Sequence, residues 1–127
     1  MKFKQLMIVS AFVEIGFGLI LLLFPSQFVN LTGGVLSEGE GKIYAKLFGA
    51  ALVSMGVLSW SFRDIEPSKV RDHVASTLMI YNTLASFVLL GGQLSQVRGP
   101  EGWVPVVLHT LLALAFAFFR FSNRQTT

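Results

Sequence analysis

Residues 5–24 read QLMIVSAFVEIGFGLILLLF, and this stretch decides the fold class. A single residue in it is charged, Glu14, and nearly all the others are apolar or small. An α-helix of about 20 residues rises about 30 Å, which is the thickness of the hydrocarbon core of a bilayer. The stretch therefore predicts a helix that spans a membrane.

Three further stretches have the same character, at about residues 43–62, 74–94 and 103–121. The whole chain of 127 residues is 53% hydrophobic and 13% charged, with a mean hydropathy of +0.64. Soluble domains carry about 25% charged residues, so a soluble globule and a disordered chain are both disfavoured. The absence of cysteine excludes a disulfide scaffold and thiol chemistry. We predict an all-α integral membrane protein, one antiparallel four-helix bundle in a single domain over residues 1–127.

The basic residues predict how the bundle is oriented. Seven lysines and arginines are predicted on one side of the membrane: Lys2, Lys4, Arg63, Lys69, Arg71, Arg120 and Arg124. Three are predicted on the other side: Lys42, Lys46 and Arg98. The positive-inside rule then places both termini in the cytoplasm, and we expect a bacterial cytoplasmic membrane. Anionic lipid suffices to explain the net charge of +3, so we expect membrane lipids as partners and no nucleic acid.

The joint between the first two spans, residues 25–42, is the longest one on the predicted outer side. Pro25 should end the first helix, because proline lacks a backbone N–H and clashes with the preceding turn. The joint begins with the apolar residues Phe28, Val29 and Leu31. Either this stretch lies at the outer interface and caps the bundle, or it is a plain connecting turn.

Glu14 is the most informative residue of the sequence. A carboxyl group in hydrocarbon costs several kcal/mol, so it needs a partner or a function. Ser10, Glu14 and Gly18 share one helix face, and small neighbours indicate that this face is turned to another helix. Glu14 is then a ligand anchor, a proton carrier or a general acid/base. The alternative is a structural hydrogen-bonding centre.

Other polar residues lie between the middle and the predicted outer end of the spans. His109 should lie roughly 9 Å deep and could meet Glu14 if the first and fourth spans pack together. Asn82 and Gln93 lie on one face of the third span, and amides in spans more often join helices than bind ligands. This one-sided distribution predicts a cavity that opens outward. With two histidines and no carboxylate cluster, the sequence predicts neither a metal site nor a cofactor.

Small residues at helical spacing in the second span predict a helix-packing seam. They recur with a seven-residue period at Ala45, Gly49, Leu52, Gly56 and Ser59.

The pattern resembles the small four-helix bacterial membrane proteins of the DoxX-like type. The resemblance rests on residues 16–18 (GFG) and 24–25 (FP), on KLFGAAL at 46–52, on Tyr81-Asn82, and on residues 102–109. Proteins of this type are often unassigned or linked to quinone-dependent respiratory complexes. The resemblance carries no catalytic motif, so it assigns no catalytic residue.

We predict that the protein binds a lipophilic small molecule, a lipid, quinone or isoprenoid, in an outward-facing cavity. The binding residues would be Glu14, His109, Asn82 and Gln93, with Glu14 and His109 holding the polar head. The alternatives are an accessory or assembly subunit of a larger membrane complex, which needs only packing seams, and an oligomeric transporter. Acid/base catalysis by Glu14 and His109 stays open, as does homo-oligomerisation.

Overall fold

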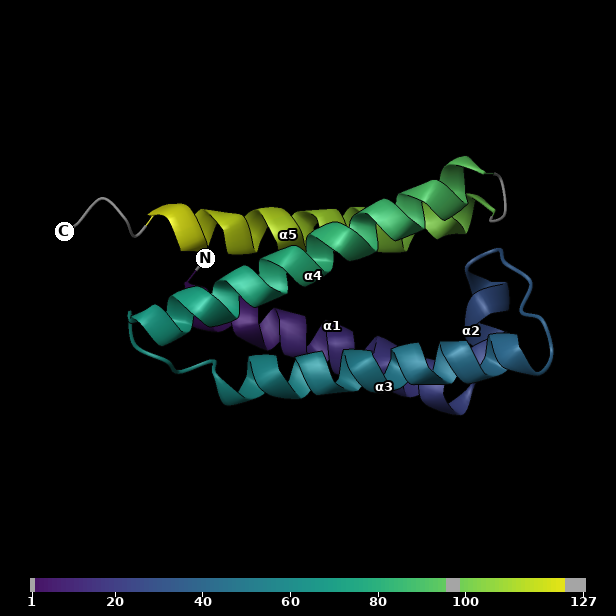
Figure 1. Ribbon diagram of the computed structural model, residues 1–127, viewed down its shortest axis with the longest axis horizontal. Helices are drawn as coiled ribbons and strands as arrows, with labels where there is room; N and C mark the ends of the chain where they lie inside the picture. The colour runs from purple at the N-terminus through teal and green to yellow at the C-terminus, as the bar shows by residue number, and fades with distance from the viewer. Residues whose placement is uncertain (1, 96–98, 123–127) are drawn as a thin grey trace.

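The computed structural model describes residues 2–95 and 99–122, and all the regular structure in these ranges is helical (Figure 1). The helices in order are α1 (Phe3–Leu23), α2 (Pro25–Leu31), α3 (Glu40–Ser61), α4 (Lys69–Leu94), the short 3-10 helix η1 (Pro100–Gly102) and α5 (Trp103–Ser122). Four segments are long and apolar enough to cross a membrane, namely α1, α3, α4 and η1 with α5. The predicted all-α fold is confirmed, and the chain is a small polytopic membrane protein.

The helix boundaries follow local chemistry more closely than hydropathy. α1 ends at Leu23, and Pro25 begins α2, where its missing N–H costs little. α4 begins at Lys69, a full turn before the predicted start at residue 74. Ser68 is the N-cap residue that sets this start, because its hydroxyl accepts a hydrogen bond from the Arg71 backbone N–H at 3.2 Å. Hydropathy marks only the apolar part of this helix.

The four spans pack as two antiparallel pairs, α1 with α3 and α4 with α5 (Figure 1). In the first pair the backbones approach closely at glycines. A Cβ added to Gly18 would lie 2.8 Å from the Gly49 carbonyl oxygen, and one added to Gly49 would lie 2.8 Å from that of Gly18. The predicted seam of small residues is therefore confirmed.

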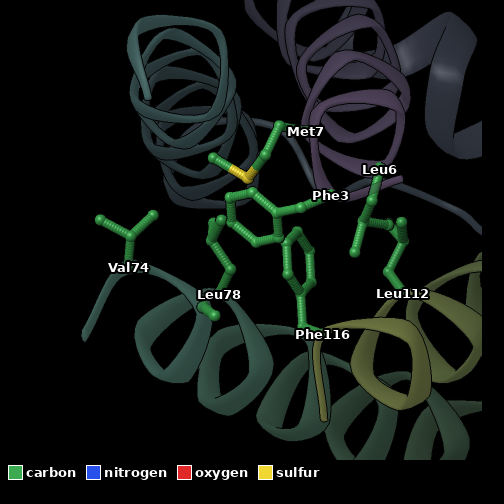
Figure 2. Packing of buried hydrophobic residues seen from close by; sticks show 8 residues of the cluster. Phe3, Leu6, Met7, Val74, Leu78, Leu112 and Phe116 are labelled. Atoms are coloured by element: carbon green, nitrogen blue, oxygen red, sulfur yellow. The ribbon is translucent and has the colours of Figure 1, made fainter. Parts of the chain in front are cut away.

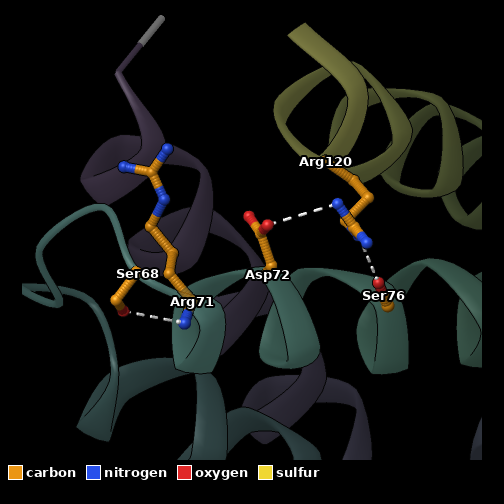
Figure 3. A network of polar contacts seen from close by, with 5 residues as sticks. All are labelled: Ser68, Arg71, Asp72, Ser76 and Arg120. Carbon is orange, nitrogen blue, oxygen red and sulfur yellow. Dashed lines mark hydrogen bonds and ion pairs between the residues drawn. The ribbon is translucent and has the colours of Figure 1, made fainter. Parts of the chain in front are cut away.

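Polar contacts accompany the packing of α4 against α5. Near the end of α5, the Arg120 guanidinium forms an ion pair with Asp72 at 3.2 Å and donates a hydrogen bond to the Ser76 hydroxyl at 2.8 Å (Figure 3). The hydroxyl oxygens of Thr110 and Ser86 lie 3.3 Å apart across the same pair of helices. Contacts of this kind connect transmembrane helices where the hydrophobic effect contributes little.

The two pairs meet in an apolar cluster near the end where α1 begins and α5 ends, which we call the closed end (Figures 1 and 2). The cluster joins α1 to α4 and α5, and Leu6, Met7, Leu78 and Phe116 in it are at most 2% exposed. Its members are Phe3, Leu6, Met7, Val74, Ala75, Leu78, Leu112 and Phe116.

The closed end also carries most of the basic residues assigned to the cytoplasmic side, including Lys4, Arg63 and Arg71. Arg124, predicted on the cytoplasmic side, and Arg98, predicted on the opposite side, lie outside the described residues. The orientation of the bundle in the membrane stays a prediction.

Candidate functional site

Toward the opposite end, which we call the open end, a cavity of about 590 Å³ lies between the two helix pairs. Small-molecule sites in proteins measure about 300–1,000 Å³ and are mostly apolar, so this cavity is of the right size. Its walls come from α1, α2, α3, α4, η1 and α5, and most of the lining side chains are apolar. Glu14 and His109 are the predicted site residues among them.

α2 forms one wall of the cavity. Phe28, Val29 and Leu31 line it, and the Phe28 ring packs edge-on against Phe17 of α1, with 5.7 Å between ring centroids. The chain after α2 reaches the other helix pair, because the Gly99 backbone N–H donates to the Gly33 carbonyl oxygen at 3.1 Å. The structure thus agrees with the capping hypothesis for this stretch rather than with a plain turn.

The junction at Gly33 requires glycine for two reasons. Its φ of +72° is a conformation that residues with a Cβ adopt only with strain. A Cβ there would also lie within 2.7 Å of the Gly99 Cα. The junction therefore closes one edge of the cavity by direct backbone contact.

Glu14 is 1% exposed and lies on the α1–α3 side of the cavity. Its Oε2 accepts a hydrogen bond from the Ser59 hydroxyl at 3.2 Å, and Ser59 lies 3.4 Å from the Ser10 hydroxyl. Its Oε1 is buried and has no hydrogen-bond partner among the described residues. The Ser10 and Ser59 hydroxyls therefore both act on the carboxyl group from the α1–α3 side, and Oε1 is left without a direct hydrogen bond in the described part of the chain.

His109 lies on the α4–α5 side of the same cavity and is 7% exposed. Its Nδ1 is 2.8 Å from Asn82 Oδ1, while Asn82 Nδ2 donates to the Leu78 carbonyl oxygen at 2.9 Å. The amide nitrogen of Asn82 is thereby committed as a donor, so its oxygen accepts and His109 carries a proton on Nδ1. In the neutral ring, Nε2 is then a hydrogen-bond acceptor.

The structure separates the four predicted binding residues into two kinds. Glu14 and His109 line the cavity, although no hydrogen bond joins them in the described part of the chain. Asn82 is fully buried behind His109 and orients its ring. Gln93 donates to the Gly99 carbonyl oxygen at 3.1 Å, so it supports the junction with Gly33.

Two further residues gave no functional prediction from sequence, Glu101 at the open end and Tyr81 in the middle of α4. Glu101 of η1 lies in the cavity wall beside the Gly33–Gly99 junction. The Tyr81 ring packs edge-on against His109, with 5.9 Å between centroids, and its buried hydroxyl has no partner among the described residues. A phenol in the middle of a span, next to Asn82, is the signal that could have identified Tyr81.

No group of three or more histidine, aspartate or glutamate side chains placed to hold a metal ion occurs within residues 2–95 and 99–122. The polar groups of the cavity are instead few and separated. They can orient the head of a bound molecule or exchange a proton with it.

No family model, curated protein or solved structure matches this chain. The resemblance to DoxX-like proteins therefore gains no support beyond the four apolar spans themselves.

Proposed function

We propose that the protein binds a lipophilic small molecule in the cavity at the open end. The observation that carries the proposal is the Glu14 carboxyl group, which is 1% exposed and lines an apolar cavity with its Oε1 unpartnered. A buried polar atom without a hydrogen bond costs about 1–3 kcal/mol. A ligand head that fills this position would remove that cost, and the apolar walls would hold the rest of the ligand.

The hydrogen-bonding roles of Glu14 and His109 narrow the ligand head. Oε2 of Glu14 already accepts from Ser59, and Nδ1 of His109 already donates to Asn82. The atoms left are Glu14 Oε1 and His109 Nε2. Nε2 accepts a hydrogen bond in the neutral imidazole, whereas Oε1 accepts when the carboxyl group is ionised and can donate when it is protonated. Within the lipids, quinones and isoprenoids predicted from sequence, this favours a head that can both donate and accept hydrogen bonds, such as a hydroxyl group.

Native mass spectrometry of the protein, extracted from its own membrane in mild detergent, tests the proposal. We expect a reproducible additional small mass on the wild type and its loss in Glu14→Gln and in His109→Ala. The chain offers matched controls, because Glu66 lies in the loop before α4 and His73 is exposed near the closed end. Glu66→Gln and His73→Ala should keep the added mass.

The same spectra test the other assignments for this chain. Additional protein chains with no small molecule would indicate an assembly or oligomeric role and contradict the proposal. A small molecule that persists in both Glu14→Gln and His109→Ala would also contradict it, because the head would then be held elsewhere.

A further inference from the structure

A second, smaller cavity of about 390 Å³ adjoins the first on the side where α3 faces α4, and we call it the side groove. Phe48 of α3 and Leu89 of α4 line both cavities, so the two are neighbours with a shared wall. The remaining lining residues all belong to α4, namely Tyr81, Leu84, Ala85 and Val88.

The side groove is open toward the surrounding membrane. Within the described residues, α3 packs on α1 and α4 on α5, while α3 and α4 have little direct packing with each other. Leu84 and Val88 are 61% and 76% exposed, and both lie within a span. Apolar side chains exposed on a span contact lipid hydrocarbon. From Tyr81 to Leu89 the helix rises roughly 12 Å, so the groove runs from mid-span toward the open end.

Tyr81 lines the inner end of the side groove, and its buried hydroxyl has no hydrogen-bond partner among the described residues. The edge-on contact of Tyr81 with His109, a residue of the main cavity, connects the groove to the proposed head site. The arrangement therefore places a polar group between an apolar channel and the two atoms proposed to hold the ligand head, His109 Nε2 and Glu14 Oε1. An amphiphile with its head at these two atoms and its chain in the groove would fill both cavities.

We propose that the side groove binds the hydrocarbon chain of the ligand and is its entrance from the membrane. The ligand is then an amphiphile with one alkyl or isoprenoid chain and a hydroxyl head, which moves between α3 and α4 without crossing water. This inference rests on the proposed function of the main cavity. It adds the chain subsite, the route of entry and a contact with Tyr81.

Photo-cross-linking with a long-chain primary alcohol that carries a diazirine near the end of its chain tests the proposal. The protein is reconstituted in phosphatidylcholine nanodiscs, and labelled residues are mapped by mass spectrometry with and without an excess of unlabelled alcohol. We expect competable labelling of Leu84 and Val88 that is lost in Glu14→Gln.

Ala85 offers a way to fill the groove with an apolar side chain. Ala85→Phe should weaken binding of the alcohol about tenfold, which corresponds to excluding about two methylene groups. Ala51→Phe is the matched control, because Ala51 is exposed on α3 and lines neither cavity. It should leave both affinity and labelling unchanged.

The outcomes separate the two proposals. Competable, Glu14-dependent labelling confined to the main cavity, at residues such as Phe28 and Val29, would overturn the side groove and leave the proposed function standing. Absence of any Glu14-dependent labelling would contradict both proposals.

Since the chain has no cysteine, Val88→Cys provides a further test. Rapid oxidation to a disulfide-linked dimer would place a second copy over the groove and overturn the inference.

Discussion

At the closed end, Phe116 is fully buried among apolar side chains from α1 and α4, whereas at the open end the equally buried Glu14 faces a cavity of about 590 Å³. The same two helix pairs build both regions, but they are packed together at one and separated at the other. The closed end thus contributes stability through packing. The open end leaves Glu14 Oε1 unpartnered, which costs stability and is the feature on which the proposed function rests.

The largest effect is expected from removing a side chain at the closed end. Phe116→Ala should lower the free energy of unfolding by about 2 kcal/mol. This is less than the 3–5 kcal/mol of a soluble core, because lipid is as apolar as the protein interior and mainly the packing term is lost. Reversible unfolding in mixed micelles measures it.

Phe118→Ala is the control for that measurement, because Phe118 lies on the same helix and is 65% exposed. It should change stability by less than about 0.5 kcal/mol. Equal effects of the two substitutions would contradict the account of the closed end.

The junction that closes the edge of the cavity should be the next most sensitive position. Gly33→Ala meets both an unfavourable positive φ and the backbone of Gly99, and we expect a loss of about 1–2 kcal/mol. Gly39→Ala introduces the same backbone strain, because Gly39 has a φ of +75°, but the added Cβ would have no atom within 4 Å. The difference between the two variants isolates the contact, and identical values would show that it contributes nothing.

The smallest effect concerns an exposed ion pair at the closed end. Lys4 Nζ lies 2.6 Å from Asp64 Oδ1, and the hydrogen bond from Lys4 holds the pKa of Asp64 below its ordinary value. A carboxylate whose folded-state pKa is lowered stabilises the fold above its unfolded pKa of about 3.9, and this is lost as the pH falls through the lower folded value.

Asp64→Asn should therefore differ slightly from the wild type near neutral pH and converge with it as the pH falls through the lowered folded-state pKa of Asp64. Unfolding midpoints measured across this range at low salt provide the check, since salt screens exposed pairs. A difference that persists in acid would assign the effect to something other than the ion pair.

The spans and the one-sided placement of polar residues were predictable because each depends on local sequence. Hydropathy locates the apolar part of every helix, and spacing shows that Ser10, Glu14 and Gly18 share a face. The period of the small residues in α3 likewise predicts its contact with α1.

The relation between the two helix pairs was not predictable in the same way. The junction of Gly33 with Gly99 and the contact of Tyr81 with His109 join residues far apart in sequence. The spacing of residues along one helix predicts neither of these two contacts. The separate roles of Asn82 and Gln93, behind the cavity rather than in it, depend on the same tertiary geometry.

The stability of Glu14→Met, measured by reversible unfolding of delipidated protein, tests most directly whether the open end is built for binding. The substitution removes the unpartnered Oε1, the bond from Ser59 and the interaction with Ser10, while the two serine hydroxyls lie 3.4 Å apart and keep each other as partners. We predict that the free energy of unfolding stays the same or rises by up to about 1 kcal/mol. A loss as large as that of Phe116→Ala would contradict the account and make Glu14 a structural hydrogen-bonding centre.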